Sequence, residues 1–138
     1  MSLSEMKKPT PVVDEDSKIF WQSCKDKKLM IQQCDECYEY IFYPRIICPY
    51  CTSEKISWVE SQGIGTVYSY TIVRKPVSPA FTKDVPYVVA MVELNEGVRM
   101  MTHIINVDIE KVQCGMKVKV TFVDEEGFIY PKFEPRYA

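Results

Sequence analysis

The sequence predicts a mainly β protein of three successive parts: an N-terminal helical segment, a small metal-stapled ribbon and a five-stranded barrel. Two observations carry this prediction. Four of the six cysteines form two CxxC pairs separated by ten residues, a spacing that lets a hairpin bring two metal-binding turns face to face. Beyond residue 65, apolar and polar residues alternate with a period of two, as in half-buried strands. The predicted boundaries are 1–28, 29–62 and 63–138.

The composition is that of a soluble globular protein. The chain has 138 residues, of which 46% are hydrophobic and 26% charged, enough for one ordinary domain or a compact domain with a small module attached. A net charge of -2 argues against nonspecific binding to phosphate backbones. No apolar run approaches the roughly 20 residues of a membrane-spanning helix, and the N-terminus lacks the apolar stretch of a signal peptide. We therefore expect a cytoplasmic protein with no membrane partner.

The first part should contain one short helix after a polar, flexible arm. From Asp14 or Asp16 to about Lys28 the sequence has no Gly or Pro, with acidic residues at the start and lysines at the end. Such a charge distribution suits the helix dipole. Its apolar residues are too few for a self-standing unit, so the helix must dock on another element. These residues are Ile19, Phe20, Trp21 and Cys24.

The ribbon should contain three short strands that flank the two CxxC pairs. Residues 29–33 lead into the first pair, residues 40–43 form the hairpin partner, and residues 56–60 follow the second pair. The stretch SQGIG at 61–65 contains two glycines and ends the ribbon. This arrangement is typical of a zinc ribbon.

The remaining chain offers five strand candidates linked by turn-forming residues. A longer connection, which includes the residues IEKVQCGM, separates the third candidate from the fourth. Five strands over about 75 residues match the size and spacing of an OB-fold, a five-stranded, partly open barrel. The candidates are residues 66–75, 86–94, 98–105, 117–124 and 127–133.

The paired cysteines predict a tetrahedral metal site. Zinc prefers four thiolates, and each CxxC turn supplies two sulfurs. Four protein ligands leave no coordination position for water or substrate, so we expect the metal to stabilise the fold and not to catalyse a reaction. The predicted ligands are Cys34, Cys37, Cys48 and Cys51.

Several alternatives to structural zinc use the same cysteines. Iron in a rubredoxin-like site has the same four ligands. A redox dithiol would need one CxxC beside a helix in a βαβ pattern, which the sequence lacks. Disulfides are disfavoured in a reducing cytoplasm.

The two remaining cysteines, Cys24 and Cys114, lie in apolar contexts, and we expect both to be buried small side chains. His103, the one histidine, reads as a packed or edge residue of a strand, and no catalytic constellation accompanies it.

Five segments, in order, resemble the zinc-ribbon and OB-fold family associated with acyl-CoA enzymes, long known as a domain of unknown function. The match covers nearly the whole chain. It departs from the family at Tyr38, where Gly is usual, and at Tyr43-Pro44-Arg45, where Pro-Pro-Arg is frequent. The segments are CDEC, YPRIICPYC, ESQGIGTVYSYTIV, PYVVAMVELNEGVRMMTHI and CGMKVKVTF.

The resemblance implies a helical segment, a rubredoxin-like zinc ribbon and a C-terminal OB-fold. It also implies a noncatalytic subunit that assembles with a thiolase-like or hydroxymethylglutaryl-CoA synthase-like enzyme, as in the mevalonate route, and helps to hold or pass CoA thioesters. Cations for the CoA phosphates and an apolar contact for pantetheine are offered by the connection RKPVSPAFTKDVPY. The candidate ligand-binding residues are Arg74, Lys75, Phe81 and Lys83.

The alternative function is binding of single-stranded nucleic acid, which OB-folds and zinc ribbons both support. Tyr68 and Tyr70 would share one strand face, with Arg74 following on the same side. The acidic isoelectric point near 5.5 makes this alternative the weaker one.

Overall fold

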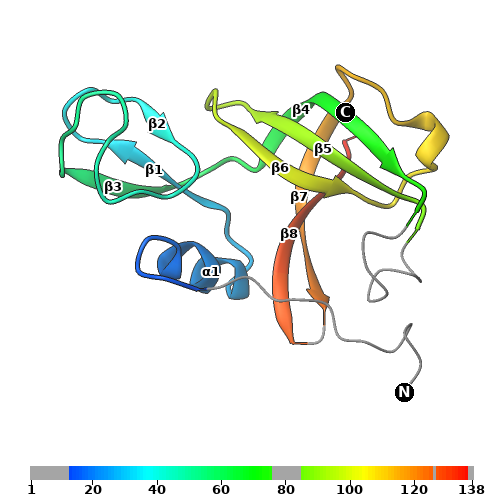
Figure 1. Cartoon of the computed structure of the whole chain (residues 1–138), viewed down its shortest axis with the longest axis horizontal. Helices are drawn as coiled ribbons and strands as arrows, with labels where there is room; N and C mark the ends of the chain where they lie inside the picture. The colour runs from blue at the N-terminus through cyan, green and yellow to red at the C-terminus, as the bar shows by residue number, and fades with distance from the viewer. Residues whose placement is uncertain (1–12, 76–84, 126, 137–138) are drawn as a thin grey trace.

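A computed structural model describes residues 13–75, 85–125 and 127–136 of the chain. One helix precedes a three-stranded sheet, and a closed five-stranded barrel follows (Figure 1). This architecture confirms the predicted fold class. None of the described helices is long and apolar enough to cross a membrane.

The helix α1 (Lys18–Lys25) is shorter than predicted. Its N-cap is Ser17, whose backbone N–H and hydroxyl both donate to the carboxylate of Asp14 at 2.9 Å. The acidic residue therefore stabilises the turn that leads into the helix and does not cap the helix itself. Phe20 and Cys24 are buried, whereas Ile19 is 46% exposed.

The ribbon sheet has β1 (Met30–Cys34) at its centre, between β2 (Tyr40–Ile41) and β3 (Ile56–Glu60). Both pairings are antiparallel. The strand β2 ends two residues earlier than predicted because the chain leaves the sheet at Phe42, whose ring packs 5.5 Å from that of Phe20.

A buried side chain fixes the loop that follows β2. Gln32 is 4% exposed, and its amide accepts from the backbone N–H of Arg45 at 2.7 Å and donates to the Arg45 carbonyl at 2.9 Å. This pair of hydrogen bonds to one residue satisfies the buried amide and also sets the path of the loop.

The barrel strands follow the order β4-β5-β6-β8-β7 and close through the pairing of β7 with β4. A short 3-10 helix (Ile109–Lys111) lies in the connection between β6 and β7. All neighbouring pairs are antiparallel except β6 and β8, which are parallel and joined at one pair, Ile104 with Phe133. The strands are β4 (Ile64–Val73), β5 (Tyr87–Leu94), β6 (Arg99–Ile104), β7 (Lys117–Glu125) and β8 (Phe128–Pro135).

A β-bulge in β4 changes the faces of two tyrosines. Val67 pairs with Val92 and Ser69 with Met91, so Tyr68 is the extra residue. Tyr70 then pairs with the buried Ala90, while Tyr68 lies on the outer surface. The prediction that Tyr68 and Tyr70 share a face was therefore wrong, because a bulge interrupts the alternation.

The exposed Tyr68 ring is already covered by the protein's own cation. The guanidinium of Arg99 lies 3.8 Å from the ring centroid, and its Nε donates to Glu93 at 3.0 Å. A base could stack on this face of the ring only by displacing Arg99. The arrangement weakens the case for a nucleic-acid stacking platform.

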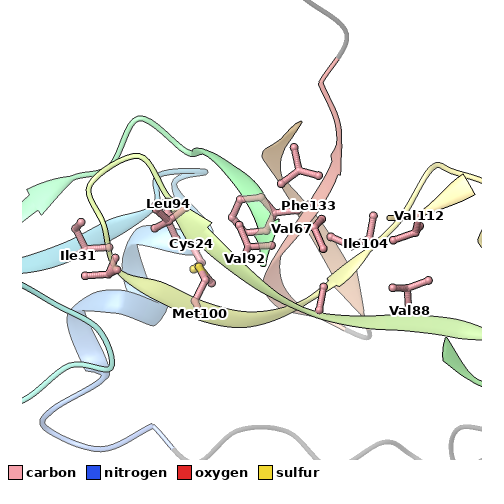
Figure 2. Close-up of a cluster of buried hydrophobic side chains, with 14 of the residues drawn as sticks. Cys24, Ile31, Val67, Val88, Val92, Leu94, Met100, Ile104, Val112 and Phe133 are labelled. Carbon is pink, nitrogen blue, oxygen red and sulfur yellow. The ribbon is translucent and has the colours of Figure 1, made fainter. Parts of the chain in front are cut away.

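One hydrophobic core joins all three parts of the chain. It includes Phe20 and Cys24 of the helix, Ile31 of the ribbon, and the inward-facing residues of the barrel. Figure 2 shows Ile31 and Cys24 at one end of this cluster, with Phe133 inside the barrel. The helix therefore docks on its own chain, in contact with β1 and β8 (Figure 1).

A carboxylate ties the junction between ribbon and barrel to a barrel hairpin. Glu96, in the turn between β5 and β6, accepts from the Ser61 hydroxyl and from the Gln62 N–H, each at 2.9 Å. The Ser61 hydroxyl in turn accepts from the Gly63 N–H at 3.0 Å. These bonds hold the linker against the barrel.

Replacing Glu96 with Ala should lower the free energy of unfolding by about 1–2 kcal/mol, because two hydrogen bonds to a charged acceptor are lost. Urea denaturation measures this change. Glu110→Ala is the matched control, since Glu110 is exposed and bonds to Asp108 through its backbone N–H, which the substitution retains. Equal effects of the two substitutions would contradict a clamping role for Glu96.

Candidate functional site

The structure brings the four predicted metal ligands together at one end of the ribbon. Their sulfur atoms all lie within 4.8 Å of one another. The Sγ atoms of Cys34 and Cys51 are 3.5 Å apart, and those of Cys37 and Cys48 are 3.7 Å apart. A tetrahedral ion with zinc–sulfur bonds of about 2.3 Å requires sulfur–sulfur separations of about 3.8 Å. The four thiols therefore fit a tetrahedral metal ion.

The two CxxC turns share one backbone design. The N–H of Tyr38 donates to the Cys34 carbonyl at 3.0 Å, and the N–H of Thr52 donates to the Cys48 carbonyl at 2.9 Å. Tyr38 and Thr52 also have positive φ angles, 63° and 64°. The substitution of Tyr for the usual Gly at position 38 is thus accommodated in the left-handed conformation, at some conformational cost.

Backbone amides in these turns point at the sulfur atoms. The N–H groups of Cys37 and Glu36 donate to Cys34 Sγ at 3.5 and 3.4 Å. These bonds, led by that of Cys37, lower the pKa of Cys34 to about 7, although burial opposes the shift. The Tyr50 N–H contacts Cys48 Sγ at 3.4 Å in the same manner. Such donors favour the thiolate form that a metal requires.

The remaining candidate residues have structural positions. Cys24 is fully buried, and burial raises the pKa of its thiol to about 12, so it is not an activated nucleophile. Cys114 is exposed, and the prediction of burial was wrong because it lies in a surface turn that continues through Gly115. His103 is half-buried and stacks on Tyr87, with ring centroids 5.0 Å apart.

Two of the four predicted CoA-binding residues fall among the described residues. Arg74 and Lys75 are exposed just beyond the end of β4. Phe81 and Lys83 lie outside the described residues. The prediction that these four side chains form one ligand site therefore stays a prediction.

A cavity of about 590 Å³ lies where helix, ribbon and barrel meet. Its walls come from α1, from the loop after β2, and from the facing stretches of β6 and β8. Sequence reasoning missed this site because β6 and β8 are adjacent only in the folded barrel. Aromatic side chains dominate its lining, including Phe20, Trp21, Phe42, Tyr43 and Tyr130.

Comparison with known families identifies both parts of the fold. Residues 21–57 match the family described as "ChsH2, rubredoxin-like zinc ribbon domain". Residues 58–123 match "ChsH2, C-terminal OB-fold domain". A solved structure titled "Ltp2-ChsH2(DUF35) aldolase" superposes with a TM-score of 0.83 at 35% identity, over 91% of this chain and 98% of that one.

Two curated relatives differ in length. A "DUF35 domain-containing scaffold protein" of Methanothermobacter thermautotrophicus is 37% identical over 98 residues, covering 69% of this chain and 73% of the relative. A "Probable enoyl-CoA hydratase alpha subunit" of Thermomonospora curvata is 35% identical over 129 residues, or 93% of this chain. The present chain spans only 40% of that hydratase subunit.

Replacing Cys48 with Ser should weaken metal binding at least about 100-fold, more than the usual effect of losing an outer-shell partner of a ligand. The remaining ligands cannot close the tetrahedron. Metal content by mass spectrometry and the urea midpoint measure the loss. Cys114→Ser is the matched control and should keep one metal per chain, because its exposed thiol is outside the cluster. Full metal content in Cys48→Ser would refute the assignment.

The six cysteines should react with a thiol reagent at pH 8 in three stages. We expect Cys114 to react first, the four clustered thiols only after a chelator removes the metal, and Cys24 only on unfolding, because its thiol is buried with a raised pKa. Absorbance of the released reagent counts each stage. Rapid reaction of five thiols in the metal-loaded protein would contradict this order.

Proposed function

Because the chain belongs to the ChsH2-type zinc-ribbon and OB-fold family, also called DUF35, we propose that it is a noncatalytic subunit of an acyl-CoA enzyme. The names of its relatives support this proposal. Some are called scaffold proteins, and the name of one solved relative combines ChsH2 with an aldolase. The partner would be an enzyme of the thiolase superfamily. In this proposal the chain divides at 28/29 and 62/63, and it acts in the cytoplasm, where free thiols persist.

In this proposal Cys34, Cys37, Cys48 and Cys51 hold a structural zinc ion. The separations of the sulfur atoms support a tetrahedral ion, and the four thiolates would occupy its whole coordination sphere. When bound, the ion supplies folding free energy to the ribbon. Because the four cysteines would occupy every coordination position of the ion, no substrate could bind to it.

The observation that carries the proposal is a group of exposed apolar side chains around the metal ligands. Five of the ten large hydrophobic side chains that are exposed among the described residues lie between positions 38 and 50. Four of them are within two residues of a ligand, and we call these four the knuckle patch. Exposed apolar groups gathered in this way mark protein interaction sites. The knuckle patch consists of Tyr38 (70% exposed), Ile46 (64%), Ile47 (48%) and Tyr50 (66%).

The knuckle patch is suited to a permanent partner. Each side chain is large, and its backbone is fixed by a neighbouring cysteine ligand, so little conformational freedom is lost on association. Tyr38 and Tyr50 belong to a residue type that is enriched among the energetic anchors of interfaces, and the two isoleucines add apolar contact area.

A CoA thioester is the proposed ligand of the assembled complex. Arg74 and Lys75 provide two exposed cations that can contact the CoA phosphates, and Phe81 and Lys83 follow in the same connection. Isothermal titration with acetyl-CoA, with and without the partner enzyme, tests this part. Charge reversal of Arg74 and Lys75 should weaken binding, whereas absence of binding in both settings would exclude the ligand.

Replacing both Ile46 and Ile47 with Ser should weaken binding to the partner enzyme about 10- to 100-fold, since one or two anchors are lost. Metal content should be unchanged because the ligands remain. Surface plasmon resonance against the co-purified enzyme measures the affinity.

Ile19→Ser is the matched control, because Ile19 is as exposed as Ile47 but lies on the helix. Its affinity for the partner should equal that of the unchanged protein. Equal affinities for all three proteins would show that the knuckle patch is not the interface.

A further inference from the structure

The barrel is closed between β6 and β8 by a single residue pair, and the sequence explains why this pairing is so short. The two strands pair at Ile104 with Phe133, where the Ile105 N–H donates to the Phe133 carbonyl at 2.8 Å. Two residues earlier β8 contains Pro131, which has no N–H to donate to a neighbouring strand. The Thr102 hydroxyl contacts the Pro131 carbonyl there instead, at 3.1 Å. No further residue pair joins these two strands among the described residues, and both strands line the cavity here.

On the edge of β6 that faces the cavity, a tyrosine hydroxyl takes the place that the carbonyl of a neighbouring strand would ordinarily have. The Met101 N–H donates to the hydroxyl of Tyr43 at 3.3 Å, longer than the usual distance for such a bond. Tyr43 is itself 54% exposed. A carbonyl oxygen of an added strand can replace a hydroxyl held in this way, because the donor and its direction are already set.

The walls of the cavity offer apolar contacts close to this edge. Trp21 packs edge-on against Tyr130, with ring centroids 6.1 Å apart, and Phe42 packs beside Tyr43 at 4.7 Å. In an extended peptide, alternate side chains point to the same side. The aromatic groups can therefore receive every second residue of a peptide that lies along β6.

The charges at the rim favour a basic peptide. Among the charged residues that line the cavity, Glu125 and Lys132 contact each other at 2.6 Å. Asp14 and Asp16 have no ion-pair partner among the described residues, and hydrogen bonds from Ser17 hold the pKa of Asp14 below its ordinary value. The rim thus presents two carboxylates that a Lys or Arg side chain can pair with.

From these observations we propose that the cavity binds an extended, basic peptide segment of another protein by strand addition to β6. A peptide carbonyl accepts from the Met101 N–H in place of the Tyr43 hydroxyl, alternate apolar side chains contact the aromatic wall, and a basic side chain pairs with Asp14 or Asp16. The proposal rests on the chain being a docking subunit, but the site is separate from the knuckle patch.

A displayed library of random dodecapeptides, selected on the full metal-loaded chain, tests the proposal without the partner enzyme. We expect enrichment of peptides with alternating apolar residues and at least one basic residue. Their binding should be lost in Met101→Pro, which removes the N–H, and kept in Met101→Ala, which retains it. Peptides that bind Met101→Pro and Met101→Ala equally, or no enrichment, would overturn the proposal.

Two further measurements guard against a misfolded proline variant. Tyr43→Phe should bind the selected peptide about 2- to 10-fold more tightly, because the competing hydroxyl is gone. Methylation of alternate backbone nitrogens of the peptide should abolish binding to the unchanged protein. Weaker binding by Tyr43→Phe, or displacement of the peptide by acetyl-CoA, would assign the cavity to a different ligand. The Ile46 and Ile47 double variant should bind the peptide normally, so failure of the partner interface and failure of this site remain distinguishable.

Discussion

The convergence of four thiols at one end of the ribbon is the constraint on which the rest of the structure depends. The ribbon has a small core of its own, in which the buried residues are Cys34, Ile41 and Cys48. So few apolar contacts cannot offset the entropy of ordering two turns that each contain a residue with positive φ. A metal ion bound by the four thiolates would supply that free energy. Both ends of the loop between Cys37 and Cys48 are then fixed, and this loop carries the side chains that contact the helix and the barrel.

The ribbon, helix and barrel are coupled through this loop and through a shared core. Phe42 contacts Phe20 of the helix, and the Tyr43 hydroxyl accepts from β6. Cys24 and Ile31 continue the barrel core into the helix and ribbon. The hydrogen bonds to Glu96 hold the linker against the barrel. The order of the metal site is therefore transmitted to the walls of the cavity by direct contacts.

The sequence was sufficient for features that depend on local pattern. The CxxC spacing identified the four clustered thiols, and the period of two located all five barrel strands to within a few residues. It was insufficient where tertiary contacts decide. The bulge at Tyr68 reverses an alternation that looks regular in the sequence, and Cys114 is exposed because of the turn that contains it. The cavity depends on two strands brought together only by barrel closure, although Pro131 was a visible sign that one strand could not pair throughout.

A closed metal centre is well suited to a subunit whose proposed role is assembly. An open coordination position would add reactivity, whereas four protein ligands give only rigidity. Rigidity matters here because immobilising flexible side chains and loops reduces the affinity of an interface. The knuckle patch lies on short turns that contain the proposed metal ligands, and Tyr43 lies on the loop between them. The same four cysteines can therefore organise both proposed recognition surfaces at once, one around the metal site and the other beside the short pairing of β6 with β8.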